Sequence, residues 1–333
     1  MNEIVSIISP CFNGEKTLHY FLDSILLQTY RHIELILIDD ASTDSTPRII
    51  EKYVPLFQQE QIKFVNLRLS KNSGQAAAIN RGLEVFSGDY LMWMDSDDIL
   101  FENAIEMKVR FMQHNNQYDF VLNEGIIVSV DDLNTPIGVL KRKKPKRNDS
   151  LFDDLLHVRN VVFGPGTILV KSAFLKSRIA DLKIFESREG QNWQLMLPLS
   201  FHSTYGYIQQ PLFKYVIHKD SHSHAKRSES EEVKRLENII ILLKETISRI
   251  NLMSQDEKKK YYKLIESDFS KRILEKYAEN RNRDEYKKYA LSMKEKGLKV
   301  HAYYFFRISL LLKRVKRYLL RIVKRLFNND KYY

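Results

Sequence analysis

Several residue types are scarce or absent in this chain, and each shortage excludes a class of protein. The 333 residues include one cysteine, Cys11, which excludes a disulfide framework and a metal site built from several cysteines. No run of 18 apolar residues is free of charges, which argues against a membrane-spanning helix. The segment Met1–Val5 has no basic residue and no long apolar run follows it, so we expect no secretory signal and a cytoplasmic protein.

The residues that are present suffice for a folded core. Hydrophobic residues make up 44% of the chain, a share that excludes general disorder. The length predicts two domains, or one large domain with an appendage. From about Glu229 onward the chain has no proline and almost no glycine, and its pattern predicts an almost wholly helical segment.

Charge is distributed unevenly along the chain. The formal net charge is +11, yet residues 1–140 carry 10 Lys and Arg against 20 Asp and Glu, and residues 141–333 carry 43 against 22. The basic excess is concentrated in Lys141–Arg147 and in the last 33 residues, which hold 9 basic residues and 1 Asp. An acidic first half fits poorly with a protein that binds a nucleic-acid backbone.

The first 130 residues alternate short β-rich runs with amphipathic helical patterns. We predict strands at Ile4–Ser9, Ile33–Asp39, Ile62–Leu67, Tyr90–Met94 and Phe120–Val130, and helices near Leu18–Gln28, Pro47–Phe57, Gln75–Val85 and Ile99–His114. Near-continuous apolar strands followed by helices indicate an α/β fold with a mostly parallel sheet flanked by helices. Ligands bind such sheets at the carboxyl ends of the strands, so we expect the chemistry there.

An acidic triplet follows the fourth of these strands. The carboxylates of Asp95, Asp97 and Asp98 repel one another unless a cation binds them, and a hard divalent ion such as Mg²⁺ or Mn²⁺ is the natural ligand. The alternative is that Asp97 or Asp98 caps a helix that begins at Ile99.

A second acidic cluster, Asp39–Asp44, follows the second strand. One interpretation is again a helix cap, with Ser42, Thr43 or Asp44 at the start of the next helix. The other is that Asp40 accepts a hydrogen bond from a nucleotide base or a ribose hydroxyl.

Four segments follow one another at characteristic positions: Ser6–Asn13, Leu37–Asp44, Asn72–Asn80 and Gly88–Asp98. Taken together and in order, they resemble the family 2 glycosyltransferases, which have the GT-A fold, and the resemblance covers about residues 3–220. It implies a nucleotide-diphosphate sugar donor, a divalent cation (Mn²⁺ or Mg²⁺) and inversion at the anomeric carbon. We accordingly predict a GT-A domain at residues 1–225, a helical extension at 226–300 and a basic amphipathic helix at 301–333.

Carried over position by position, the resemblance implies roles for particular residues. The donor nucleotide is expected to contact Pro10, Phe12, Asn13, Asp39, Asp40, Asn80 and Asp95. Asp95-Ser96-Asp97 matches the DxD motif of the family, so Asp97 is expected to bind the metal that bridges the diphosphate, and Asp95 to reach the ribose or a metal-bound water. One departure is Ile79, because many relatives have Arg at this position, and Arg81 is the neighbour that could compensate.

An inverting transfer needs a general base that deprotonates the acceptor hydroxyl. The resemblance places this base in a Glu-Asp pair at the start of a helix, and Ser187–Gln194 matches that segment with Glu189 but has Gly190 in place of Asp. Glu189 is therefore the predicted base, and the alternative is an ordinary first-turn glutamate. Trp193 is expected either to form the floor of the acceptor site or to pack in the core.

Two further segments have a counterpart in the family. His218–His224 follows a strand-like run, and His222 or His224 is placed to bind the metal or the diphosphate unless these are ordinary surface histidines. Gly164 and Gly166 lie in a glycine-rich segment that borders the acceptor in relatives, although a plain turn explains the same residues.

Residues 308–326 are amphipathic when they are placed on a helix. Ile308, Leu311, Leu312, Val315, Leu319, Ile322, Val323 and Leu326 fall on one stripe, and seven Lys and Arg occupy the remaining face. Such a pattern is typical of a helix that binds an anionic membrane surface. The alternative is a helix packed on the protein's own core.

These expectations describe a metal-dependent inverting glycosyltransferase that moves a sugar to a glycan or lipid-linked acceptor in surface polysaccharide synthesis, peripheral on the inner face of the cell membrane. A nucleotidyltransferase would share the sheet and the carboxylates but release pyrophosphate. A third class is a catalytically degenerate, membrane-associated assembly module. Gly190, which stands where relatives have Asp, favours it, whereas the intact pair Asp95 and Asp97 argues against it. A nucleic-acid binder would show strongly salt-dependent binding to arbitrary DNA and no donor binding.

Overall fold

The structure is a computed structural model that describes residues 3–142, 150–161, 164–218, 227–300 and 315. The chain forms two compact units: residues 1–225 together with 242–258, and residues 226–241 together with 259–333. Residues 242–258, which the sequence pattern places in the helical extension, thus group with the first unit. The predicted C-terminal helix at 301–333 lies outside the described residues except for Val315.

The first unit contains a nine-stranded mixed sheet. Its strands are β1 (Val5–Cys11), β2 (Ile33–Asp39), β3 (Lys63–Arg68), β4 (Tyr90–Trp93), β5 (Ile99–Leu100), β6 (Phe120–Ser129), β7 (Gly138–Leu140), β8 (Ile168–Lys171) and β9 (Gly206–Ile217). Its helices are α1 (Leu18–Leu26), α2 (Thr46–Gln59), α3 (Gln75–Val85), α4 (Ala104–His114), α5 (Leu151–Leu156), α6 (Ser172–Arg178) and α7 (Gln191–Ser200). The remaining helices of the chain are α8 (Glu229–Ser248), α9 (Gln255–Glu279) and α10 (Arg283–Glu295).

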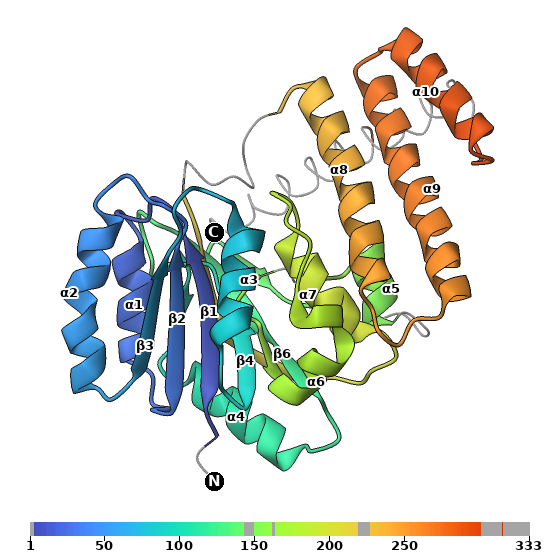
Figure 1. Cartoon of the computed structure of the whole chain (residues 1–333). Helices are drawn as coiled ribbons and strands as arrows, with labels where there is room; N and C mark the ends of the chain where they lie inside the picture. The colour runs from blue at the N-terminus through green and yellow to red at the C-terminus, as the bar shows by residue number, and fades with distance from the viewer. Residues whose placement is uncertain (1–2, 143–149, 162–163, 219–226, 301–314, 316–333) are drawn as a thin grey trace, which may run out of the picture. The chain divides into compact units, whose positions relative to one another are not determined.

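The sheet has the strand order β3-β2-β1-β4-β8-β6-β9-β5, with β7 paired to β6. The first four strands are parallel, β8 runs antiparallel to both of its neighbours, and β9 is parallel to β6. The chain moves outward from β1 to β2 and β3 and then returns to the other side of β1 with β4, so the strand order reverses between β1 and β4 (Figure 1). Crevices at such reversals are the usual ligand sites of open α/β sheets.

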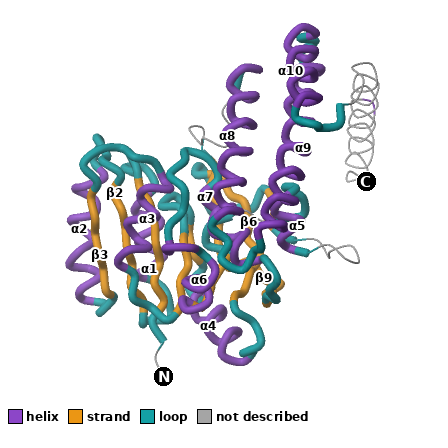
Figure 2. The backbone as a smooth tube through the Cα atoms, turned by 45° about the vertical axis from the view of Figure 1, so that its right-hand side comes forward, coloured by secondary structure: helices purple, strands orange, loops and turns teal. Residues whose placement is uncertain are grey.

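The apolar runs form central strands because both faces of the sheet are covered. Every residue of β1, β2 and β4 is buried. Ile7, Leu35 and Leu37 belong to one core cluster with α1 and α2, and α3 packs against β1 and β2. Figure 2 shows the strands with α1, α2 and α3 around them. The sequences of β1, β2 and β4 are therefore largely apolar and do not alternate between apolar and polar residues.

The helix predicted at Ile99–His114 is wrong at its start. Ile99 and Leu100 form β5, which pairs antiparallel with Lys214 and Phe213 of β9, and α4 begins only at Ala104. Pairing with a strand more than a hundred residues away in the sequence outweighs the local helical pattern. Asp97 and Asp98 therefore do not cap a helix at Ile99, and the carboxylate of Asp98 instead binds the backbone of β9.

The second unit is helical in its described part. Asn282 precedes α10, accepts a hydrogen bond from the Glu285 backbone at 3.3 Å, and donates to the Glu229 carboxylate at 2.7 Å. Among the residues described by the structure, no helix is both long enough and apolar enough to cross a membrane.

Candidate active site

The ends of β1, β2 and β4 bring three polar segments together. Cys11 ends β1 opposite Asp39 of β2, and the Met94 backbone N–H donates to the Ile8 carbonyl of β1 at 3.0 Å. The Ser96 hydroxyl hydrogen-bonds the Cys11 thiol, whose pKa burial raises to about 12. The acidic triplet after β4 thus lies beside the end of β1, at the reversal in strand order.

The carboxylates of Asp95, Asp97 and Asp98 form one cluster. Each contributes an oxygen that lies within 4.8 Å of the others. Asp98 is fully buried; its Oδ1 accepts a hydrogen bond from the Val216 backbone at 2.9 Å, whereas its Oδ2 has no partner among the residues that the structure describes. Burial and the neighbouring Asp97 carboxylate raise the pKa of Asp95 to about 8, and the same causes raise the pKa of Asp98 well above its ordinary value.

This cluster fits a hard divalent cation. A buried carboxylate oxygen without a partner and a set of mutually repelling carboxylates are both destabilising until a cation binds them. His218 Nε2 lies 3.1 Å from Asp97 Oδ2, which adds an imidazole to the set of oxygen donors. Oxygen-rich sites of this kind suit Mg²⁺ and Mn²⁺.

His218, which the sequence reasoning did not single out, lies at the acidic cluster. His222 and His224 lie outside the described residues. His218 comes directly after Ile217, the last residue of β9, and Asp98 binds the same strand through Val216. The sequence does show that His218 is the first residue after the strand-like run. It does not show that β5 pairs with β9, which is the pairing that brings His218 to the acidic cluster.

Asp40, which directly follows β2, holds the loop before α3 through both of its carboxylate oxygens. Oδ1 accepts from the Ser73 backbone and Oδ2 from the Gly74 backbone, each at 2.7 Å. Gly74 has φ +90° and directly precedes α3. Asp40 therefore holds the segment that begins α3, a role that the sequence reasoning did not anticipate.

Asp39 and Asn13 brace the neighbouring loop. Asp39 Oδ1 accepts from the Ser42 backbone at 2.8 Å and Oδ2 pairs with Arg68 Nη1 at 3.0 Å. Asn13 donates its backbone N–H to Ser42 Oγ at 2.9 Å, and its side chain accepts from the Thr43 backbone at 2.9 Å. Asp44 Oδ1 accepts from the Thr46 backbone at 2.9 Å, although the N-cap residue of α2 is Ser45 and not one of the three predicted residues.

Pro10 and Phe12 differ in exposure. Pro10 is paired with Ile38 inside the sheet, whereas Phe12, just past the end of β1, is 47% exposed. An exposed aromatic ring at the end of β1 offers a stacking surface for a planar ligand.

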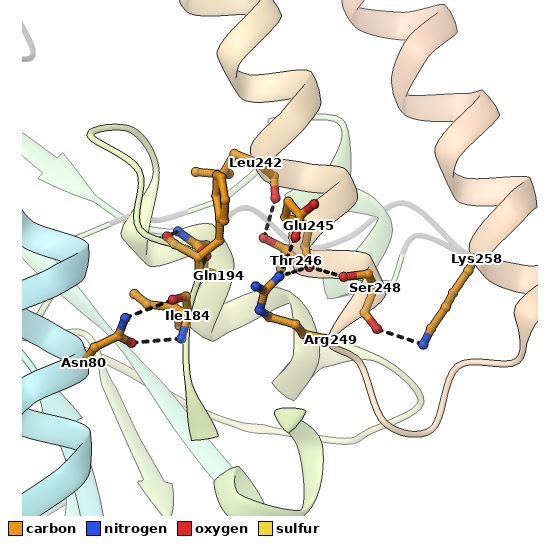
Figure 3. A network of polar contacts seen from close by, with 10 residues as sticks. Asn80, Ile184, Gln194, Leu242, Glu245, Thr246, Ser248, Arg249 and Lys258 are labelled. Carbon is orange, nitrogen blue, oxygen red and sulfur yellow. Dashed lines mark hydrogen bonds and ion pairs between the residues drawn. The ribbon is translucent and has the colours of Figure 1, made fainter. Parts of the chain in front are cut away.

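Asn80 connects α3 to the chain before α7. Its amide donates to the Ile184 carbonyl and accepts from the Ile184 backbone N–H, both at 2.9 Å (Figure 3). Ile79 is buried in the core, and Arg81 is paired with Glu84 on the same helix. Asn80 thus holds the Ile184 segment in place, and a contact with the donor remains a prediction.

Gly190 has a conformational reason to replace Asp. It immediately precedes α7 with φ +61°, a region that other residues rarely adopt, and a Cβ there would lie 2.8 Å from the Trp193 ring. Asn192 Oδ1 accepts from the Trp93 indole at 2.8 Å, so the first turn of α7 reaches the end of β4. Glu189 lies three residues before Asn192, and its role as the base remains a prediction.

The glycine-rich turn also borders the end of β4. The Gly166 backbone N–H donates to the Trp93 carbonyl at 2.8 Å, and the fully buried Lys108 donates its ammonium to the Gly166 carbonyl. Burial lowers the pKa of Lys108 to about 7. A Cβ on Gly164 would lie 2.5 Å from the Phe213 ring, so only glycine fits there. Trp193, which is half-buried, donates to the Leu155 carbonyl at 2.9 Å.

Comparisons with known proteins give a consistent result. Residues 6–163 match the model of glycosyl transferase family 2. The chain is 29% identical to the glycosyltransferase EpsE of Bacillus subtilis (strain 168) over 67% of this chain and 76% of EpsE. It is 35% identical to WfgD of Escherichia coli, a UDP-Glc:alpha-D-GlcNAc-diphosphoundecaprenol beta-1,3-glucosyltransferase, over 37% of this chain and 49% of WfgD. The chain is thus matched to less than half of the length of WfgD.

Solved structures confirm the predicted GT-A fold. A fragment of S. aureus TarS in complex with UDP-GlcNAc aligns over 90% of this chain and 93% of its own, with a TM-score of 0.57 and 17% identity. The mannosyltransferase PcManGT from Pyrobaculum calidifontis, in complex with GDP-Man and Mn²⁺, aligns over 96% of this chain and 81% of its own, with a TM-score of 0.54 and 14% identity.

Proposed function

Because the chain carries a family 2 glycosyltransferase domain over residues 6–163 and is a glycosyltransferase, we propose that it is metal-dependent and inverting. In this proposal it transfers a sugar from a nucleotide-diphosphate donor to a glycan or lipid-linked acceptor in surface polysaccharide synthesis. The observation that carries the proposal is the cluster of Asp95, Asp97 and Asp98 at the end of β4, with an unpartnered oxygen on Asp98. Such a cluster is costly to maintain unless it binds a cation.

The carboxylates of Asp95, Asp97 and Asp98, joined by the His218 imidazole, would hold the divalent cation. When bound, the cation supplies positive charge that neutralises the donor diphosphate. TarS with UDP-GlcNAc and PcManGT with GDP-Man and Mn²⁺ have the same fold, which supports a nucleotide-sugar donor and a divalent cation here as well.

The chain's own residues would place the donor nucleotide. Phe12 offers an exposed ring for the base, with Pro10 and Asn13 bordering it and Asp39 and Asp40 beneath the loops on either side. Because Asp39 and Asp40 already hold backbone N–H groups, the loops at this edge of the sheet are ordered before the donor arrives, which lowers the entropic cost of binding.

Glu189 is the proposed general base. Its carboxylate takes the proton of the acceptor hydroxyl while the hydroxyl oxygen forms a bond to the anomeric carbon from the side opposite the leaving group. The bond from that carbon to the diphosphate oxygen breaks, and its electron pair remains on the diphosphate. Gly164, Gly166 and Trp193 would border the acceptor, because the turn and the start of α7 both contact Trp93 or its neighbours.

The membrane is the proposed location. Residues 301–333 carry 9 basic residues and 1 Asp, and an amphipathic helix of this charge would bind anionic lipid on the inner face of the cell membrane, beside a lipid-linked acceptor.

Ligand-dependent thermal stability and product analysis test the function. Purified protein with Mn²⁺ is screened against UDP, GDP and their sugar derivatives, and we expect one base to raise the melting temperature, because a ligand of the native state stabilises it. Asp97→Asn should remove the Mn²⁺-dependent part of the shift. Release of nucleoside diphosphate supports the transferase, whereas release of pyrophosphate indicates a nucleotidyltransferase. Donor binding without turnover on any acceptor or on water would favour an assembly module.

A further inference from the structure

Arg188 lies against the loop that begins α3, although it is 113 residues away from Gln75 in the sequence. Its Nη2 donates to Asn72 Oδ1 at 3.2 Å. A Cβ built on Gly74 would lie 3.7 Å from Arg188 Cγ, so the aliphatic part of the side chain covers this glycine. The Arg188 side chain thus lies along the loop that precedes α3, a helix of 11 residues, with its guanidinium at Asn72.

The same loop leads directly to the acidic cluster. Gln75, the first residue of α3, donates its side-chain amide to Asp95 Oδ1 at 3.5 Å. Asp40 holds the backbone N–H groups of Ser73 and Gly74, which keeps the loop in a fixed conformation. Glu189, the proposed base, is the residue after Arg188. Arg188 therefore contacts the loop before α3, whose next residue, Gln75, reaches Asp95, and it directly precedes the proposed base in the sequence.

The charge of Arg188 is not neutralised by any residue that the structure describes. No described carboxylate lies within 4.0 Å of its guanidinium, in contrast to Arg68 with Asp39 and Arg81 with Glu84. The N-terminus of α3, which begins three residues after Asn72, carries a partial positive charge, so it and the guanidinium both attract an anion to this loop. Both favour an anion with several oxygens, because a guanidinium donates two parallel hydrogen bonds to such groups.

We propose that Arg188 binds the donor diphosphate and stabilises the leaving nucleoside diphosphate, an inference that rests on the proposed function. When the bond between the anomeric carbon and the diphosphate oxygen breaks, the electron pair stays on that oxygen, and a cation placed there stabilises the charge as it develops. The acceptor proton goes to Glu189. The structure assigns this role to Arg188 and not to Arg81, the compensating residue considered from the sequence, because Glu84 already neutralises Arg81.

The test compares Arg188→Gln with Arg81→Gln, a substitution of the same kind on α3. Affinities for UDP and GDP are measured by calorimetry with Mn²⁺, and uridine and guanosine are measured as competitors. Loss of a charge-assisted contact should weaken binding of the diphosphate by about 10- to 100-fold. Binding of the matching nucleoside should not change, and Arg81→Gln should behave as wild type. Arg188→Lys should recover part of the affinity, because it keeps the charge but not the planar fork.

The outcomes separate this inference from the proposed function. If the wild-type protein binds neither UDP nor GDP, the proposed function fails first. If it binds one of them and Arg188→Gln binds it equally tightly, the role of Arg188 is refuted while the function stands. Equal weakening of diphosphate and nucleoside, or a lowered melting temperature of the free variant, would show that Arg188 only supports the loop, which also overturns the inference.

Discussion

Several side chains of the candidate site form hydrogen bonds with backbone groups of other segments. Asp40 binds Ser73 and Gly74, Asp98 binds Val216, and Asn80 exchanges two hydrogen bonds with Ile184. Each bond joins segments that are far apart in the sequence. The loops that surround the acidic cluster are therefore ordered in advance, which favours both donor binding and correct placement of reacting groups.

Glu189→Gln should abolish transfer and leave donor binding unchanged. The amide is nearly the same size as the carboxylate but does not accept the acceptor proton, so we expect a loss of about 10²- to 10⁴-fold in kcat. Glu186→Gln is the matched control, because Glu186 lies on the same segment and is paired with Lys183 at 4.0 Å. Turnover and nucleotide affinity are measured on both variants. Near-normal turnover of Glu189→Gln would remove Glu189 from the mechanism.

At the scale of elements, α3 approaches the sheet unusually closely because it has a glycine where it crosses β1. A Cβ on Gly82 would lie 2.6 Å from Ile8 Cγ2, 3.0 Å from Cγ1 and 3.1 Å from Cδ1, and Ile8 is fully buried. This close contact fixes the distance of the helix from the sheet. The N-terminus of α3, with Gln75 near Asp95, is positioned as a consequence.

Gly82→Ala should destabilise the protein, although alanine is the better helix former by about 1 kcal/mol. The added methyl group overpacks the interface with Ile8, and we expect a net loss of about 1–3 kcal/mol in the free energy of unfolding, measured by urea denaturation. In an Ile8→Ala background the contacted atoms are gone, so Gly82→Ala should cost less there. A gain in stability from Gly82→Ala alone would contradict the packing argument.

At the scale of the whole molecule, the two parts of the sequence have opposite charge. Residues 1–140 have a net charge of −10, and residues 141–333 have +21. The acidic part contains the carboxylates that would hold a cation, and much of the basic surplus lies in the last 33 residues. Under the proposed function, this uneven distribution fits binding of the C-terminal segment to a membrane surface, whereas an acidic first part fits poorly with a nucleic acid.

Removal of residues 301–333 should shift the protein from the membrane pellet to the soluble fraction. Each basic residue near an anionic surface contributes roughly 1 kcal/mol to the free energy of membrane binding. Because salt screens this attraction, binding should also weaken as the salt concentration rises. Co-sedimentation with phosphatidylglycerol vesicles measures this, with neutral phosphatidylcholine vesicles as the comparison. A full-length variant with Gln at the seven Lys and Arg of 308–326 shows whether membrane binding depends on the charge of the segment or only on its presence. If fractionation is the same for all three proteins, the segment packs on the protein itself.

Much of the fold could be predicted because its strands are continuous apolar runs. β2 and α3 have the predicted bounds, β4 and β6 differ by one residue at one end, and β1 and β3 differ by one or two residues at both ends. The acidic triplet could be placed at the end of β4 for the same reason. The error at Ile99 arose because β5 is two residues long and exists only through its pairing with β9, so no local pattern could reveal it.

The sequence by itself determined the order of most elements, the resemblance of residues 6–163 to glycosyl transferase family 2 and the candidate site residues, because hydrophobic periodicity and motif spacing are local properties. Only the tertiary structure decided which of these residues meet. His218 reaches Asp97 and Arg188 reaches Asn72 because strand pairing and helix packing join segments separated by more than a hundred residues. The partner of a side chain depends on those long-range contacts, and no spacing along the chain encodes them.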